Sequence, residues 1–190
     1  MKRIVPALLI GLCEILIASP AHAIGPQVGR CMMGNCVWTK ILNKELVKEK
    51  DGASLYKIQY QEGIAPLNDD SGHCYKDDNF DESEGLKKSI HWYSPNTAFV
   101  FCSNKLPSVI TTIAKIIPVT LNGTEYGRAN SVSTYAPVCH NVTVKQFLSK
   151  KFLDDHHYQE SGLEMIMIKN PYKMFELLDP KVLEAHENKF

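Results

Sequence analysis

The chain has 190 residues, with 21 Lys and Arg against 21 Asp and Glu, so its formal net charge is zero. This balance gives no electrostatic bias towards nucleic acid or anionic lipid, and we expect neither as a partner. Residues 24–190 have a length that suits one globular domain with its own hydrophobic core.

The first 23 residues have the parts of a secretory signal peptide. Lys2-Arg3 precedes an apolar run over residues 4–18, and Ala21-His22-Ala23 places small residues where a signal peptidase acts. The run is too short to cross a bilayer of about 30 Å, so we expect cleavage after Ala23, no membrane insertion afterwards, and a periplasmic or secreted protein. Lipid attachment at Cys13 is a minor alternative, because Leu12 stands where a small residue is required.

Five cysteines lie beyond the signal: Cys31, Cys36, Cys74, Cys102 and Cys139. Export places them in an oxidising compartment, where pairing is expected. We predict a Cys31–Cys36 bridge around Gly34-Asn35, a turn-forming pair, and a Cys102–Cys139 bridge between two apolar segments. Cys74 is then left over. A zinc site at the first pair is the competing interpretation, but no nearby Cys/His pair completes the ligand set.

Two antiparallel strands are predicted over residues 37–60. Apolar and polar residues alternate on both sides of Asp51-Gly52, a dipeptide typical of tight β-hairpin turns. The pattern indicates strands with one face towards solvent.

An exposed acidic loop is predicted over residues 63–85. Its charges make it the candidate surface for a protein partner, through Asp77, Asp78, Asp81 and Glu82. Asp77, Asn79 and Asp81 also resemble the first ligands of a calcium loop. That match fails because Glu82 and Lys88 occupy the positions of the required glycine and glutamate, so we expect no metal.

The richest run of aromatic and β-branched residues covers 89–121. We predict one strand over 89–93, a turn at Ser94-Pro95-Asn96, and a second strand over 97–102 that forms a hairpin with the first. The continuous apolar character of residues 98–101 favours a strand buried on both faces. Residues 108–117 fit either a strand or an amphipathic helix, and their β-branched content favours the strand.

The C-terminal third contains the predicted helices. Thr143 is a candidate N-cap for a helix over residues 144–153 that packs on the sheet. Residues 163–168 resemble a strand that Pro171 ends, and residues 181–185 suggest a short last helix.

Three pairs of neighbouring residues are candidate sites of chemistry: Cys139-His140, His73-Cys74 and His156-His157 beside Asp154-Asp155. Adjacent side chains in a strand point to opposite faces, so each cysteine is poorly placed to act with the histidine beside it. Neighbouring histidines do not share a helical face, so His156-His157 is a poor metal site. The sequence also has no G-x-S-x-G, no H-E-x-x-H and no phosphate loop. We therefore assign no catalytic residue and expect no cofactor.

The pattern as a whole predicts an α+β domain, mainly antiparallel sheet with one packed helix and a short C-terminal helix, held by disulfides. For such a small, neutral, exported domain we favour a bacterial binding or inhibitory module, such as an immunity-type protein that neutralises a secreted toxin or hydrolase. The alternative is an exported hydrolase or thiol enzyme that uses Cys139 or Cys74 with a histidine.

Overall fold

A computed structural model describes residues 24–32, 35–66, 90–112, 115–119, 129–158, 167–179 and 181–182. Within these ranges the chain forms one antiparallel sheet in the order β1-β2-β3-β5-β6-β7, and β4 pairs with β3 as well. The strands are β1 (Gln27–Met32), β2 (Asn35–Lys50), β3 (Ala53–Pro66), β4 (His91–Trp92), β5 (Asn96–Cys102), β6 (Ser108–Ile110) and β7 (Ile116–Pro118).

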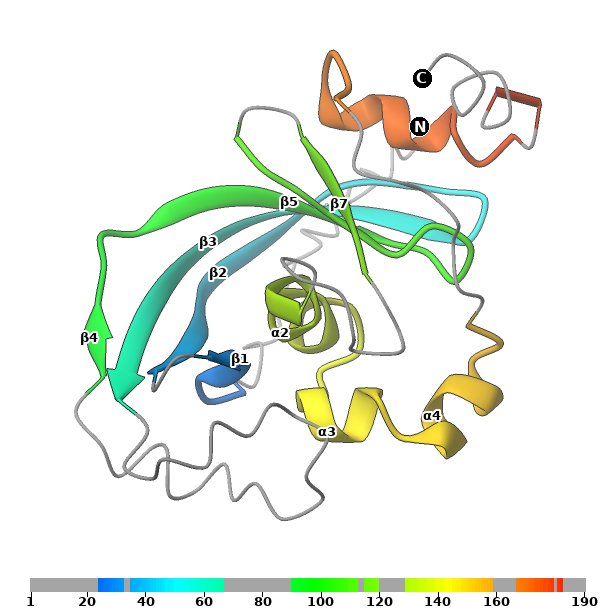
Figure 1. Ribbon diagram of the computed structural model, residues 1–190. Coiled ribbons are helices and arrows are strands. Elements are labelled where there is room, and N and C mark those ends of the chain that lie inside the picture. The colour runs from blue at the N-terminus through cyan, green and yellow to red at the C-terminus, as the bar shows by residue number, and fades with distance from the viewer. Residues whose placement is uncertain are drawn as a thin grey trace, which may run out of the picture.

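The sheet curls into a half-barrel around one main helix, α2 (Ala129–Cys139), which lies in its concave face (Figure 1). Shorter helices follow as α3 (Val144–Phe147), α4 (Lys150–Asp155) and the 3-10 helix η1 (Pro171–Phe175). The predicted α+β class with a mainly antiparallel sheet is confirmed. Among the described residues, no helix combines the length and the apolar character that crossing a membrane requires.

The hairpin predicted around Asp51-Gly52 is confirmed, with strands longer than expected, because β2 and β3 pair from Asn35↔Pro66 to Lys50↔Ala53. The pairing shifts register between Ile41 and Asn43 and again between Leu46 and Lys48. Bulges of this kind bend a strand and increase its twist, which suits two long strands that follow the curl of the sheet.

The hairpin predicted around Ser94-Pro95-Asn96 is wrong. Both β4 and β5 run antiparallel to β3, so the chain keeps its direction through this segment. Tyr93 N still donates to Glu62 O at 2.9 Å, just before the interruption. Pro95 has no N–H to donate, and it therefore breaks one long strand instead of reversing it.

The strand interpretation of residues 108–117 is confirmed in part. The segment forms two short antiparallel strands, β6 and β7, in place of one, and residues 113–114 between them lie outside the described residues. Further along the chain, Met167 forms an isolated antiparallel bridge with Lys115. Pro171 begins η1, where the sequence predicted only the end of a strand.

The helix predicted over residues 144–153 is interrupted. Thr143 caps α3 as expected, with Gln146 completing a capping box, but the helix stops at Phe147 and α4 starts under a second cap at Ser149. The main helix on the sheet is instead α2. Its residues 131–138 are all buried, so it lacks the one-sided apolar stripe by which a surface helix is found in a sequence.

Clusters of buried residues cover both faces of the sheet. On the concave face, Ile58 and Val100 pack with Val132 and Tyr135 of α2 and Phe147 of α3. On the convex face, the sheet packs against the η1 segment, by which we mean η1 and the described residues that follow it up to Val182. The buried residues of this cluster include Leu55, Phe101 and Ile110 from the sheet and Met174, Phe175 and Leu177 from the η1 segment. The strand β5 is thus buried on both faces, as its apolar sequence predicted.

Hydrogen bonds join α2 to β2. Ser133 Oγ forms a buried hydrogen bond of 2.9 Å with Thr39 Oγ1 of β2, and Lys44 Nζ donates to Val138 O at 3.0 Å. A cation at the carbonyl end of a helix also complements the helix dipole.

Candidate binding pocket

A cavity of about 890 Å³ lies at the end of the sheet where β2 turns into β3. We call it the β2–β3 pocket. The hairpin contributes Lys48, Lys50, Asp51 and Gly52; the loop from β5 to β6 contributes Ser103, Asn104 and Lys105. The η1 segment contributes Tyr172, Phe175, Glu176, Leu178, Asp179 and Val182. Its volume lies within the range of ligand sites, which is roughly 300–1,000 Å³.

The hairpin wall is shaped by the turn itself. Asp51 and Gly52 both have positive φ, 52° and 75°, which is the requirement of the tight turn that follows the twist of two strands. Lys50 Nζ lies 3.6 Å from Asp51 Oδ2 on the open surface, and exposed pairs of this kind contribute little to stability. The turn fixes the positions at which the hairpin lysines reach the pocket.

The loop between β5 and β6 is held from several directions. Ser103 Oγ accepts from the backbone N–H groups of Lys105 and Leu106 at 3.2 and 3.3 Å. The backbone N–H and C=O of Ser103 both bond the Tyr135 hydroxyl, each at 3.2 Å. Asn104 Nδ2 donates to His156 O at 2.8 Å. This wall of the pocket is therefore preorganised.

The disulfide between Cys102 and Cys139 ties the start of this loop to the end of α2, with a Cα–Cα distance of 5.4 Å. The predicted pair is confirmed. Because its sulfur is in the bridge, Cys139 presents no thiolate in this state, and a thiolate is the form that acts as a nucleophile.

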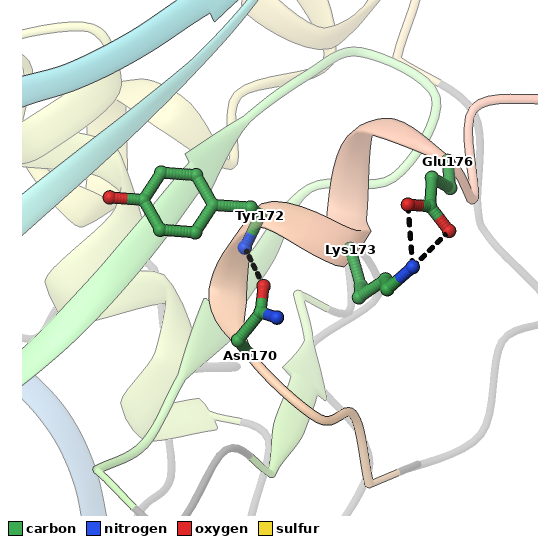
Figure 2. A network of polar contacts seen from close by, with 4 residues as sticks. All are labelled: Asn170, Tyr172, Lys173 and Glu176. Carbon is green, nitrogen blue, oxygen red and sulfur yellow. Dashed lines mark hydrogen bonds and ion pairs between the residues drawn. The ribbon is translucent and has the colours of Figure 1, made fainter.

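The third wall is η1, whose first turn is capped by Asn170. The Asn170 side chain accepts from Tyr172 N at 3.0 Å, and the Lys173 ammonium bonds both oxygens of Glu176 at 2.7 and 2.8 Å (Figure 2). The Tyr172 ring points away from this ion pair and is 50% exposed. Phe175, also in η1, is buried and meets Phe101 edge to face, with 5.1 Å between the ring centroids.

A second group of interest is the His140 cluster, formed by Tyr135, His140, Phe147, Phe152, His156 and Tyr158. His140 Nε2 hydrogen-bonds the Tyr158 hydroxyl, and that hydroxyl bonds the Tyr135 hydroxyl at 2.9 Å. A tyrosine has one hydroxyl proton, so when Tyr135 donates to Ser103 O, Tyr158 donates to Tyr135 and His140 Nε2 is the donor to Tyr158. The cluster thus reaches the pocket loop through Ser103.

Burial shifts the acid–base equilibria of this cluster towards the neutral forms. Desolvation, with a smaller contribution from His156, lowers the pKa of His140 to about 4. Desolvation also raises the pKa of Tyr158 to about 12 and that of Tyr135 well above its ordinary value. All three groups are neutral near pH 7, which suits a structural hydrogen-bond chain.

Of the histidines singled out in the sequence, His140 and His156 have structural contacts here, and His73 lies outside the described residues. His140 bonds Tyr158, while His156 Nδ1 lies 2.9 Å from Phe152 O and its ring stacks on Phe152 at 4.0 Å. Among the residues that the structure describes, no group of three His, Cys, Asp or Glu side chains is placed to hold a metal ion.

The remaining predicted site residues are only partly placed. Cys31 lies directly opposite Cys36 in the β1–β2 ladder, and Cys36 is disulfide-bonded, but the Cys31 side chain is outside the described part, so their bridge stays a prediction. Cys74 and the acidic-loop residues Asp77, Asp78, Asp81 and Glu82 also lie outside the described residues.

Sequence reasoning missed Lys105 and Tyr172 as pocket residues, although it found the turn beside Lys48 and Lys50. Asn170-Pro171 is a turn signal that precedes Tyr172, but no local pattern indicates that η1 folds back onto the hairpin. The pocket joins segments that are far apart in the chain, so no local sequence pattern predicts it.

The chain matches no protein-family model, and no curated protein or solved structure matches it significantly.

Proposed function

We propose that this chain is an exported binding or inhibitory module that recognises a protein partner through the β2–β3 pocket. The observation that carries the proposal is the composition of the pocket. An exposed tyrosine and a buried phenylalanine of η1 lie beside lysines and carboxylates, and another wall of the pocket is the β5–β6 loop, which is held by a disulfide and by Tyr135. Aromatic anchors surrounded by a polar rim are typical of protein recognition sites.

Preorganisation supports the same proposal. A loop that is already ordered loses less conformational entropy when a partner binds, and more of the interaction energy appears as affinity. Export, which the first 23 residues predict, would keep the Cys102–Cys139 bridge oxidised and the loop in place.

The enzyme alternative draws less support from the described residues. Ser103 is the one hydroxyl of Ser or Thr type in the described pocket lining, and its oxygen already accepts two backbone N–H groups. Cys139 would need its bridge reduced before it could act as a nucleophile.

An immunity-type role, in which the pocket holds a secreted toxin or hydrolase, fits the proposed binding module.

Site-specific photocrosslinking tests the proposal. The photoreactive residue p-benzoylphenylalanine replaces Tyr172 in the pocket or, as a control, Tyr93, which is similarly exposed at 46% but belongs to the segment between β4 and β5. Both proteins are expressed in the bacterial host and irradiated. We expect a discrete protein adduct from position 172 only. Equal labelling from both positions, or no adduct from position 172, would contradict the proposal.

A further inference from the structure

The carboxylates that line the β2–β3 pocket already have partners within the chain. Glu176 accepts both of its bonds from Lys173, and Asp51 lies 3.6 Å from Lys50. Asp179 Oδ1 accepts from the backbone N–H of Lys181 at 2.9 Å. These acidic groups are therefore engaged before any ligand arrives.

Two of the lysines differ in this respect. Among the described residues, no carboxylate lies within ion-pair distance of Lys48 or Lys105, although both line the pocket. The Lys48 ammonium lies 4.8 Å from the centroid of the Phe175 ring, over its face. That contact holds the ammonium beside an apolar surface and leaves its hydrogen-bond donors without an anion from the described part of the chain.

We propose that the pocket recognises a carboxylate of the partner protein, through Lys48 and Lys105, together with an apolar or aromatic group next to that carboxylate. The inference rests on the proposed function and names the chemistry of the contact. Tyr172 and Phe175 supply the aromatic surface, and Leu178 and Val182 extend its apolar part. A charged ligand group gains most where an unpaired ammonium lies beside a surface that excludes water.

A small-molecule probe tests this chemistry without the partner. N-acetylphenylalanine carries a carboxylate next to an aromatic ring, and N-acetylphenylalaninamide has the same shape without the charge. Each is titrated into the 15N-labelled exported protein, with disulfides intact, to tens of millimolar. We expect saturable shifts of the amide signals of Gly52, Asn104 and Lys105 with the acid, and binding of the amide weaker by about fivefold or more.

Matched variants assign the effect to the two lysines. Lys48→Gln and Lys105→Gln should each weaken binding of the acid by about fivefold, and Lys105→Arg should retain it. Lys145→Gln is the control, because Lys145 is an exposed residue of α3 that is not part of the pocket, and it should bind as the wild type does.

Four results would overturn the inference: no saturable shift with the acid, equal binding of the amide, an equal loss in the Lys145→Gln variant, or tighter binding of inorganic phosphate. The last would identify a phosphate site in place of a carboxylate site. If position 172 still crosslinks to a protein when this probe fails, the proposed function stands and only the carboxylate inference is lost.

Discussion

The identity of a residue is constrained most strongly where its side chain is polar and buried, or where neighbouring atoms leave no room for a larger side chain. The hydroxyl of Tyr158 connects His140 to Tyr135, and Tyr135 in turn holds both backbone polar groups of Ser103. Leaving one member of such a chain without its partner is costly, because the remaining group keeps the full penalty of desolvation. Hydrogen-bond satisfaction therefore constrains the identities of these residues in addition to their packing.

His140 should make the stability of the protein depend on pH. Its pKa falls from 6.5 to about 4 on folding, so above pH 6.5 the imidazole is neutral in both states. Between pH 6.5 and about 4 the unfolded chain binds a proton that the folded chain does not, and stability decreases as the pH falls. Below that window both states are protonated and this contribution stops changing.

The comparison is made with His140→Phe, which keeps a ring among Phe147, Phe152 and Tyr158. The midpoint of urea unfolding should fall less steeply with decreasing pH in this variant than in the wild type. Parallel pH profiles for the two proteins would contradict the assignment of this titration to His140.

Gly63 is required by its neighbours. Gly63 lies in β3, directly opposite Trp92 of β4. A Cβ added to it would lie 2.6 Å from Ile90 Cγ2 and 2.7 Å from Trp92 Cε3. Gly63→Ala should therefore lower the free energy of unfolding by about 1–3 kcal/mol, the usual cost of overpacking. Gly25→Ala is the control, because a Cβ there meets nothing within 4 Å. Equal chemical denaturation curves for the two variants would refute the steric explanation.

At the scale of elements, local signals were sufficient for some segments and insufficient for others. Asp51-Gly52 specifies its own turn, and Thr143 with Gln146 specifies the start of α3, so both were predicted correctly. In α2, serine, threonine and tyrosine are buried along with the apolar residues, and Pro137 lies inside the helix. Its helical state depends on tertiary packing, which no local pattern of the sequence contains.

The Cys102–Cys139 bridge joins two of these elements, and its removal should affect both stability and the pocket loop. Cys102→Ala should lower the free energy of unfolding by about 2–5 kcal/mol, as is typical when a native disulfide is removed from a small domain, and should release the Cys139 thiol. Thiol titration and urea denaturation measure the two effects. An unchanged thiol count together with an unchanged midpoint would contradict the bridge.

For the whole molecule, the sequence was enough to predict an antiparallel sheet with a helix packed on it, because alternation and β-branched content report burial directly. It was not enough to predict which helix fills the concave face or that η1 covers the opposite face. Those features depend on contacts between distant segments, and the β2–β3 pocket is one of their products.

Export is a prediction for the whole chain and can be checked chemically. The mature protein recovered from the periplasm or the medium should begin at Ile24 on N-terminal sequencing, because Ala21-His22-Ala23 forms the cleavage site. A lipid on Cys13 or a retained Met1 would show that the segment is not a cleaved signal peptide.

The most direct test uses the partner protein that the crosslinking experiment identifies. Its affinity for two single variants of this protein is measured by calorimetry. Tyr172→Ala removes the exposed aromatic wall of the pocket, whereas Tyr93→Ala removes a similarly exposed ring between β4 and β5. If the β2–β3 pocket is the recognition site, Tyr172→Ala should weaken binding about tenfold or more and Tyr93→Ala should leave it unchanged. Unchanged affinity for Tyr172→Ala, or an equal loss in both variants, would contradict it.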